Sequence, residues 1–302
     1  MLVLVGGNGF LGRHLTVRAH EAAIPTVVVS RNPDSQFLTT YAPSAASLPL
    51  DDFQRRPGDQ LLLERATALI YLASQSVPGS NVENPSLEMT GNVEPAFNAF
   101  LRVGHLRPDL PIVFLSSGGT VYGRTDHQPI PETAPLRPIS PYGLGKVIIE
   151  RCLLFCGETL GQRYFILRAS NAIGRWHRNP QQGLAMAVLR AINSGTPLNV
   201  YGDGTAVRDY IDADDIADAI IDVVSAGPKN DIWNVSSGIG YSVLDLVDMI
   251  EQVIGKRPEI KFWPNRKVDV SSAVLDPSKM LRDFGWKAKT PLLVALQKAL
   301  LA

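Results

Sequence analysis

Near its start the chain reads Leu2-Val3-Leu4-Val5-Gly6-Gly7-Asn8-Gly9-Phe10-Leu11-Gly12. An apolar run ends in glycines spaced three apart, and a helical pattern follows at once. The first glycine permits a tight strand-to-helix turn, the second lets the backbone approach a pyrophosphate, and the third lets the helix pack closely on the strand. The N–H groups at the helix start then face a diphosphate. The stretch predicts a dinucleotide site formed by Gly6, Gly9, Phe10, Leu11 and Gly12.

Apolar runs alternate with helical stretches, which favours a parallel sheet with helices on both faces. Strands are predicted at residues 2–5, 26–29, 68–72, 112–116 and 164–167, and helices at residues 10–22, 86–103, 141–160 and 184–193. The predicted strands are apolar without alternation, as expected when both faces of a sheet are buried. Residues 124–140, rich in proline and polar side chains, are predicted to form a loop over the sheet.

These patterns predict an α/β protein with a Rossmann-type doubly wound parallel sheet and a smaller C-terminal α/β domain. We expect residues 1–170 to form the dinucleotide-binding domain. After about Asn171 the pattern changes to short strands and helices divided by turns. Residues 171–302 are therefore expected to form a substrate domain, with segments that can interleave between the two.

Composition excludes several classes of protein. The 29 basic and 29 acidic residues balance, so no nucleic-acid partner is expected. No apolar run approaches the ~20 residues that a membrane span needs, and the first residues are typical of a strand rather than of a signal peptide. Cys152 and Cys156 lie four apart on a predicted helix, and no His or Cys cluster completes a metal site. We expect a cytoplasmic protein without metal or membrane anchor.

Two segments carry groups suited to proton transfer. Tyr142 and Lys146 lie four residues apart on a predicted helix, so their phenol and ammonium share one face. A tyrosine with a pKa of about 10 is a poor base at neutral pH, but a nearby ammonium favours its phenolate. The segment 114–123 places hydroxyls at the end of a predicted strand, where ligands of parallel sheets bind. Its alternative role is a turn whose Ser and Thr side chains satisfy their own backbone.

The chain resembles the extended short-chain dehydrogenase/reductase family, in particular its NAD-dependent sugar-nucleotide epimerases and dehydratases, of which the UDP-glucose 4-epimerases are one group. The matching segments follow one another over almost the whole chain. They are residues 6–12, 70–73, 92–93, 116–123, 142–146, 167–171, 200–204, 207–211, 276–279 and 284–286.

The resemblance implies a role for residues in both halves of the chain. Tyr142 would be the catalytic base and Lys146 its helper, and both would also contact a bound nicotinamide cofactor. Further cofactor contacts are implied for Leu72, Ala73 and Asn92. The substrate contacts implied in the second half are Asn171 near the sugar or phosphates, Tyr201 on the nucleotide base, and Arg208 and Arg266 on the diphosphate.

One departure from the family concerns the catalytic hydroxyl. The family usually has Ser or Thr where Gly118 stands. If the strand continues, Thr120 shares the face of residue 118, whereas Ser117 does not. The sequence therefore favours Thr120 as the hydroxyl that binds the sugar oxygen, with Ser117 as the alternative.

A second departure concerns the cofactor. An NAD site usually has an acidic residue after the second strand for the ribose 2′-hydroxyl, but this chain has Ser30-Arg31. Serine and arginine suit a 2′-phosphate, so NAD is expected as the cofactor and NADP stays open beside it. Asp51 lies where the family has an aspartate near the adenine.

The resemblance implies an NAD(P)-dependent sugar-nucleotide 4-epimerase acting on a UDP-sugar. Tyr142 would deprotonate the C4 hydroxyl as hydride passes to the nicotinamide, and a transient 4-keto sugar would turn before hydride returns. Two alternatives remain: an NADPH-dependent keto-sugar reductase, which Arg31 favours, and a non-catalytic dinucleotide-sensing protein, which the presence of Tyr142 and Lys146 disfavours. The resemblance also implies a homodimer formed through the predicted helices 86–103 and 141–160.

Overall fold

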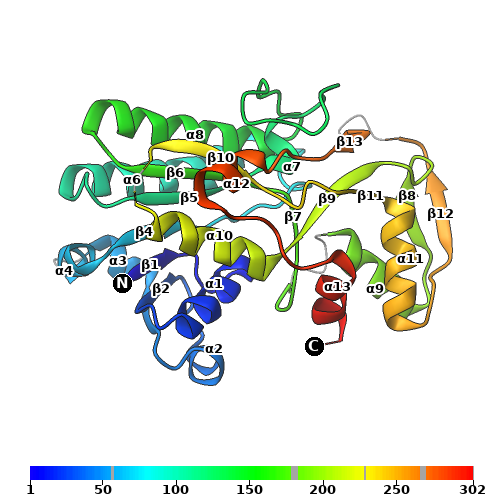
Figure 1. Ribbon diagram of the computed structural model, residues 1–302, viewed down its shortest axis with the longest axis horizontal. Helices are drawn as coiled ribbons and strands as arrows, with labels where there is room; N and C mark the ends of the chain where they lie inside the picture. Colours follow the sequence, from blue (N-terminus) through cyan, green and yellow to red (C-terminus); the bar gives the residue numbers. More distant parts are fainter. Residues whose placement is uncertain (56–57, 178–182, 228, 266–269, 302) are drawn as a thin grey trace.

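The computed structural model describes residues 1–55, 58–177, 183–227, 229–265 and 270–301. Its main element is a seven-stranded parallel sheet in the order β10-β6-β5-β4-β1-β2-β3 (Figure 1). The strands are β1 (Leu2–Val5), β2 (Thr26–Ser30), β3 (Ala46–Pro49), β4 (Ala68–Tyr71), β5 (Ile112–Ser117), β6 (Tyr164–Ala169), β7 (Asn171–Ile173), β8 (Leu198–Tyr201), β9 (Val207–Asp212), β10 (Asp231–Val235), β11 (Gly240–Ser242), β12 (Ile260–Trp263) and β13 (Ser272–Ala273).

Helices cover both faces of this sheet, so the predicted Rossmann-type fold is confirmed. Figure 1 shows α6 and α8 along one face and α1, α2 and α10 along the other. The helices are α1 (Phe10–Glu21), α2 (Ser35–Tyr41), α3 (Leu50–Arg55), α4 (Gly58–Arg65), α5 (Ser86–Glu88), the π-helix η1 (Met89–Val93), α6 (Glu94–Leu106), α7 (Gly118–Val121), α8 (Pro141–Leu160), α9 (Leu184–Ser194), α10 (Ala213–Ser225), α11 (Val243–Ile254), α12 (Ser278–Phe284) and α13 (Leu292–Leu300).

The apolar strands form two cores because successive side chains point to opposite faces of the sheet. Leu2 and Leu4 of β1 pack in the core under α1 and α10. Val3 and Val5 of the same strand pack in the core under α6 and α8. A strand buried on both faces needs apolar residues at every position, which explains the unbroken runs in the sequence.

Segments from the second half of the chain join the first sheet. β10 pairs with β6, and α10 packs beside α1. A separate apolar core forms among α9, α11, α13, β8 and β9, with Val188, Leu246 and Leu296 fully buried. The proposed division at residue 170 stays a prediction, with β10 as an interleaved segment.

The predicted helix over residues 86–103 differs in detail. It consists of α5, the π-helix η1 and α6. Pro95 lies at the start of α6 and lacks the N–H group that a regular helix would donate to the carbonyl of Gly91. The missing bond accounts for the wider turn just before it, a form often found at functional sites.

Candidate functional site

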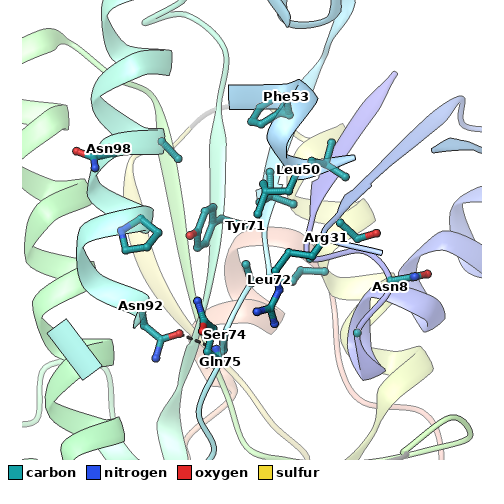
Figure 2. Close-up of a pocket in the computed structure, with 18 of the residues that line it drawn as sticks. Asn8, Arg31, Leu50, Phe53, Tyr71, Leu72, Ser74, Gln75, Asn92 and Asn98 are labelled. Atoms are coloured by element: carbon teal, nitrogen blue, oxygen red, sulfur yellow. Dashed lines mark hydrogen bonds between the residues drawn. The ribbon is translucent and has the colours of Figure 1, made fainter. Parts of the chain in front are cut away.

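A cavity of about 700 Å³ lies where the strand order reverses between β1 and β4. Ligands of doubly wound sheets bind at such a point, beyond the carboxyl ends of the strands. Figure 2 shows side chains from the ends of β2 and β4 and from α3, η1 and α6 around the cavity. The predicted cofactor residues that line it are Gly6, Gly9, Ser30, Arg31, Leu72, Ala73 and Asn92.

The glycine-rich turn has the close approaches that the sequence predicts. Gly6 has a φ of +87°, and a Cβ there would lie 2.6 Å from the backbone nitrogen of Ala73. Gly9 precedes α1 as its N-cap, and a Cβ on Gly12 would lie 2.5 Å from Gly7. The start of α1 therefore faces the cavity with bare backbone, which suits a pyrophosphate.

Two buried polar atoms at the cavity have no hydrogen-bond partner among the described residues. They are the Oγ of Ser30 and the Oδ1 of Asn8. Both residues line the cavity, and Leu50 and Phe53 of α3 add an apolar wall. Polar atoms are rarely left buried and unpaired, so a ligand with hydroxyl or amine groups is the expected partner. The Ser30 hydroxyl, the Asn8 amide oxygen, the apolar wall and the glycines without side chains fit a dinucleotide such as NAD.

The remaining predicted cofactor residues lie around this cavity rather than on it. Phe10 contacts the ring of His14, and Leu11 packs against the core under α1. Gly12 allows α1 to pack closely against the backbone of Gly7. Asp51 is exposed on α3, beside the lining residue Leu50. A contact between Asp51 and the adenine therefore stays a prediction.

A buried carboxylate joins the cavity to α8, and sequence reasoning missed it. Glu88 is only 1% exposed, and its Oε1 accepts hydrogen bonds from Ser76 Oγ at 3.0 Å and Asn92 Nδ2 at 2.9 Å. Asn92 also accepts from the backbone N–H of Gln75 at 2.7 Å (Figure 2). A Cβ on Gly145 would lie 2.7 Å from Glu88 Oε1, so only glycine fits there.

Tyr142 and Lys146 lie together on α8, on the face that Gly145 shares. The Lys146 Nζ lies 5.5 Å from the centre of the Tyr142 ring, and it donates to the carbonyl of Leu115 on β5 at 3.3 Å. Lys146 is buried and Tyr142 half-buried. A phenol and an ammonium are thus held side by side at the carboxyl end of β5.

The surroundings set the protonation of this pair. Burial raises the pKa of Tyr142 to about 12, with Glu88 raising it too and a hydrogen bond with Ser117 lowering it. Burial lowers the pKa of Lys146 to about 8, against the opposing effects of Glu88 and Glu150. At neutral pH the phenol is therefore protonated, and forming its phenolate needs further positive charge.

The structure corrects the premise behind the choice of hydroxyl. Strand β5 ends at Ser117 and helix α7 begins at Gly118, so the strand geometry does not reach Thr120. The Ser117 side chain lies near enough to Tyr142 to lower the pKa of its phenol, whereas Thr120 donates to the carbonyl of Ser117 at 3.3 Å. A Cβ on Gly118 would lie 2.3 Å from Leu275 Cδ1, so Leu275 occupies the space of a side chain there.

We expect Ser117→Ala to lower the rate of turnover more than Thr120→Val. Ser117 acts on the pKa of the Tyr142 phenol, whereas the hydroxyl of Thr120 donates to the backbone carbonyl of Ser117. Both variants should be measured on one substrate at saturating cofactor. A larger loss in the Thr120 variant would assign the substrate hydroxyl to Thr120.

The predicted substrate residues that the structure describes lie on three strands of the second half, of which β7 and β9 pair with each other and β8 pairs with β12. Asn171 donates to the carbonyl of Asp209 at 2.9 Å, and a Cβ on Gly119 would lie 3.6 Å from its Oδ1, so Asn171 faces the turn after β5. Tyr201 is 41% exposed at the end of β8. Arg208 is half-buried on β9. Arg266 lies outside the described residues.

The described parts of the chain hold neither a cluster of metal-ligating side chains nor a membrane-spanning helix. There, no three His, Cys, Asp or Glu side chains come together as a metal site would require. No helix in those parts is long and apolar enough to cross a membrane.

Comparison with known proteins places these features in a family. A profile of the NAD dependent epimerase/dehydratase family matches residues 2–236. The chain is 29% identical over 296 residues to a putative UDP-glucose 4-epimerase of Methanocaldococcus jannaschii, covering 97% of this chain and 94% of that protein. It is 30% identical over 292 residues to a dTDP-4-dehydro-6-deoxyglucose reductase of Escherichia coli, covering 95% and 92%.

A solved structure shares the fold over almost its whole length. It is the UDP-glucose-4-epimerase from Stenotrophomonas maltophila with bound NAD and formylated UDP-arabinopyranose. The TM-score is 0.88 at 26% identity, covering 99% of this chain and 96% of that one.

Proposed function

Because the chain belongs to the NAD-dependent epimerase/dehydratase family, we propose that it is a sugar-nucleotide 4-epimerase acting through a transient 4-keto sugar. The observation that carries this proposal is the placement of Tyr142 and Lys146 beside Ser117, at the end of the strand next to the dinucleotide cavity. The cofactor is NAD, which the related structure from Stenotrophomonas holds. A UDP-sugar is the proposed substrate because several relatives and neighbours act on or bind one.

The residues divide the chemistry among them. Tyr142 takes the proton of the C4 hydroxyl and later returns it, while Ser117 holds the same oxygen by a hydrogen bond. Lys146 keeps a positive charge beside the phenol and lowers the cost of its ionisation. When bound, the oxidised nicotinamide supplies the acceptor for the hydrogen at C4 and a second positive charge. Asn171, Tyr201, Arg208 and Arg266 are proposed to orient the sugar nucleotide.

A panel of UDP-sugars incubated with the protein and catalytic NAD tests the proposal. Proton NMR should show one UDP-sugar converted into its C4 epimer with no net change in absorbance at the wavelength of the reduced cofactor. Failure of every sugar nucleotide to react while the cofactor stays bound would instead support a dinucleotide-sensing protein.

The second candidate is a keto-sugar reductase that consumes NADPH or NADH. Two observations favour it: the 30% identity to the dTDP-4-dehydro-6-deoxyglucose reductase and the absence of a carboxylate at Ser30-Arg31. The same assay separates the two, because a reductase oxidises one equivalent of reduced cofactor for each keto sugar and yields no epimer pair.

Arg208→Ala is expected to weaken binding of UDP about tenfold or more and to leave NAD binding unchanged. A guanidinium that makes charged hydrogen bonds to a diphosphate contributes about 1.5–3 kcal/mol, and Arg208 lies in the half proposed for substrate. Calorimetry with UDP and with NAD measures the two affinities separately. An unchanged UDP affinity would leave Arg208 with a structural role, of which its bond to the carbonyl of Val207 is an example.

We also propose a cytoplasmic homodimer. Leu144 and Phe155 of α8 are 43% and 49% exposed, and Leu106 of α6 is 41% exposed, so these helices present apolar side chains to solvent. Light scattering should give twice the chain mass of 32.8 kDa, and Phe155→Glu should give the chain mass itself. A monomeric wild-type protein at micromolar concentration would contradict the proposed dimer.

A further inference from the structure

The residues at the end of β2, Ser30 and Arg31, differ from the carboxylate that an ordinary NAD site has there. Ser30 is the last residue of β2, and Arg31 and Asn32 follow it at the rim of the cavity. In a doubly wound sheet the adenosine ribose lies at this strand end, where a carboxylate binds the 2′-hydroxyl of NAD. A carboxylate there also repels a 2′-phosphate, so its presence or absence decides between the two cofactors.

Serine and arginine at this strand end are both open to a ligand. Ser30 is 8% exposed, and its Oγ has no hydrogen-bond partner in the described structure. Figure 2 shows the side chain of Arg31 reaching into the cavity. Across residues 1–55, 58–177, 183–227, 229–265 and 270–301, Arg31 makes no hydrogen bond or ion pair, so its charge is not already committed.

The loop that faces Ser30 is fixed in place. Asn8 donates from Nδ2 to the carbonyl of Asn32 at 2.6 Å, which ties the glycine-rich turn to the end of β2. The remaining buried oxygen, Asn8 Oδ1, is unpaired within the described parts of the chain. The hydrogen bond thus holds the glycine-rich turn next to Ser30 and leaves Asn8 Oδ1 available to a ligand.

Two acidic residues near the cavity, Asp34 and Glu94, are already paired or lie away from Ser30. Asp34 is paired with the buried guanidinium of Arg13 at 2.5 Å. Among the described lining residues Glu94 supplies the carboxylate, and it begins α6, whose Asn98 lies on the other side of the cavity from Arg31 in Figure 2. Among the described residues that line the cavity, Arg31 is the charged residue next to Ser30 in the chain.

We propose that Ser30 and Arg31 form a subsite for the 2′-phosphate of NADP, so that the protein binds NADP(H) as well as NAD. The guanidinium makes charge-assisted hydrogen bonds to the phosphate, and the Ser30 hydroxyl gains the partner that it lacks. The inference rests on the proposed function only in taking the cavity as the dinucleotide site. It holds for an epimerase and for a reductase alike.

Adenosine 2′,5′-bisphosphate and 5′-AMP isolate the proposed contact because they differ only in the 2′-phosphate. Isothermal calorimetry on the full chain should show the bisphosphate binding about tenfold or more tighter than 5′-AMP. Arg31→Ala should remove this difference and leave 5′-AMP binding unchanged. Arg31 is exposed, so its replacement is not expected to disturb folding.

Arg102→Ala serves as the charge-matched control. Arg102 also lines the cavity, but its guanidinium bonds the carbonyl of Phe53 at 3.2 Å. If the phosphate contacts Arg31 specifically, the Arg102 variant should bind the bisphosphate more tightly than 5′-AMP by the same factor as the wild-type protein. A smaller factor in this variant would show that the preference comes from the overall positive charge of the cavity. Equal binding of the two nucleotides to the wild-type protein would overturn the inference. In that case conversion of a UDP-sugar with NAD would still support the proposed function. Tighter binding of the bisphosphate without conversion of any UDP-sugar would instead support the subsite and contradict the proposed function.

Discussion

Tyr142→Phe is expected to lower the turnover rate by about 10²–10⁴-fold, the usual loss when a general acid–base group is removed. The change removes one hydroxyl and keeps the ring that packs beside Lys146. Cofactor binding should stay unchanged, because Tyr142 lies beside the cavity and not among its lining residues. Single-turnover measurements on the substrate, with calorimetry of NAD, check both statements.

Tyr164→Phe provides a matched control. Tyr164 begins β6 and is half-buried, with its ring packed against Gly157. Removing its hydroxyl should leave turnover at the wild-type rate. A Tyr142 variant that turns over as fast as this control would remove Tyr142 from the mechanism.

The largest expected loss of stability follows from breaking the buried ion pair beneath the site. Arg168 and Glu150 are 2% and 1% exposed, and Arg168 Nη2 lies 2.7 Å from Glu150 Oε2. Glu150 also accepts from Ser116 Oγ at 2.5 Å, and Arg168 donates to the Tyr122 hydroxyl at 3.0 Å. Arg168→Leu should lower the free energy of unfolding by about 3–5 kcal/mol, because a carboxylate is then buried without its partner.

Urea-induced unfolding measures this effect, and two further variants interpret it. The double variant Arg168→Leu with Glu150→Leu should recover part of the loss, since it leaves no unpaired charge. Arg257→Ala breaks exposed pairs with Asp248 and Glu251 and should cost less than about 1 kcal/mol. A loss in Arg168→Leu no larger than that of Arg257→Ala would show that the buried pair does not stabilise the fold.

Local patterns predicted the frame of the site well. The glycine-rich turn and the apolar strand β1 lie at the residues where the sequence predicts them, because each pattern favours one local backbone conformation. The spacing of Tyr142 and Lys146 likewise fixes a shared helix face, whatever the rest of the chain does.

Contacts between segments far apart in the chain could not be predicted from local sequence patterns. β5 ends at Ser117 where Leu275 packs on Gly118, and Leu275 is held by a bond from its N–H to Asp209. No pattern near residue 118 signals that contact. Glu88 was missed for the same reason, since its neighbours Ser76 and Gly145 come from separate elements. The four-residue spacing of Glu88 and Asn92 was the available signal, and it is common in helices.

Proton NMR of a UDP-sugar incubated with the protein and catalytic NAD shows whether the C4 epimer forms. The proposed function predicts an equilibrium mixture of two C4 epimers, formed without net oxidation or reduction of the cofactor and lost in Tyr142→Phe. Stoichiometric oxidation of NADPH by a keto sugar, with no epimer formed from any UDP-sugar, would contradict it.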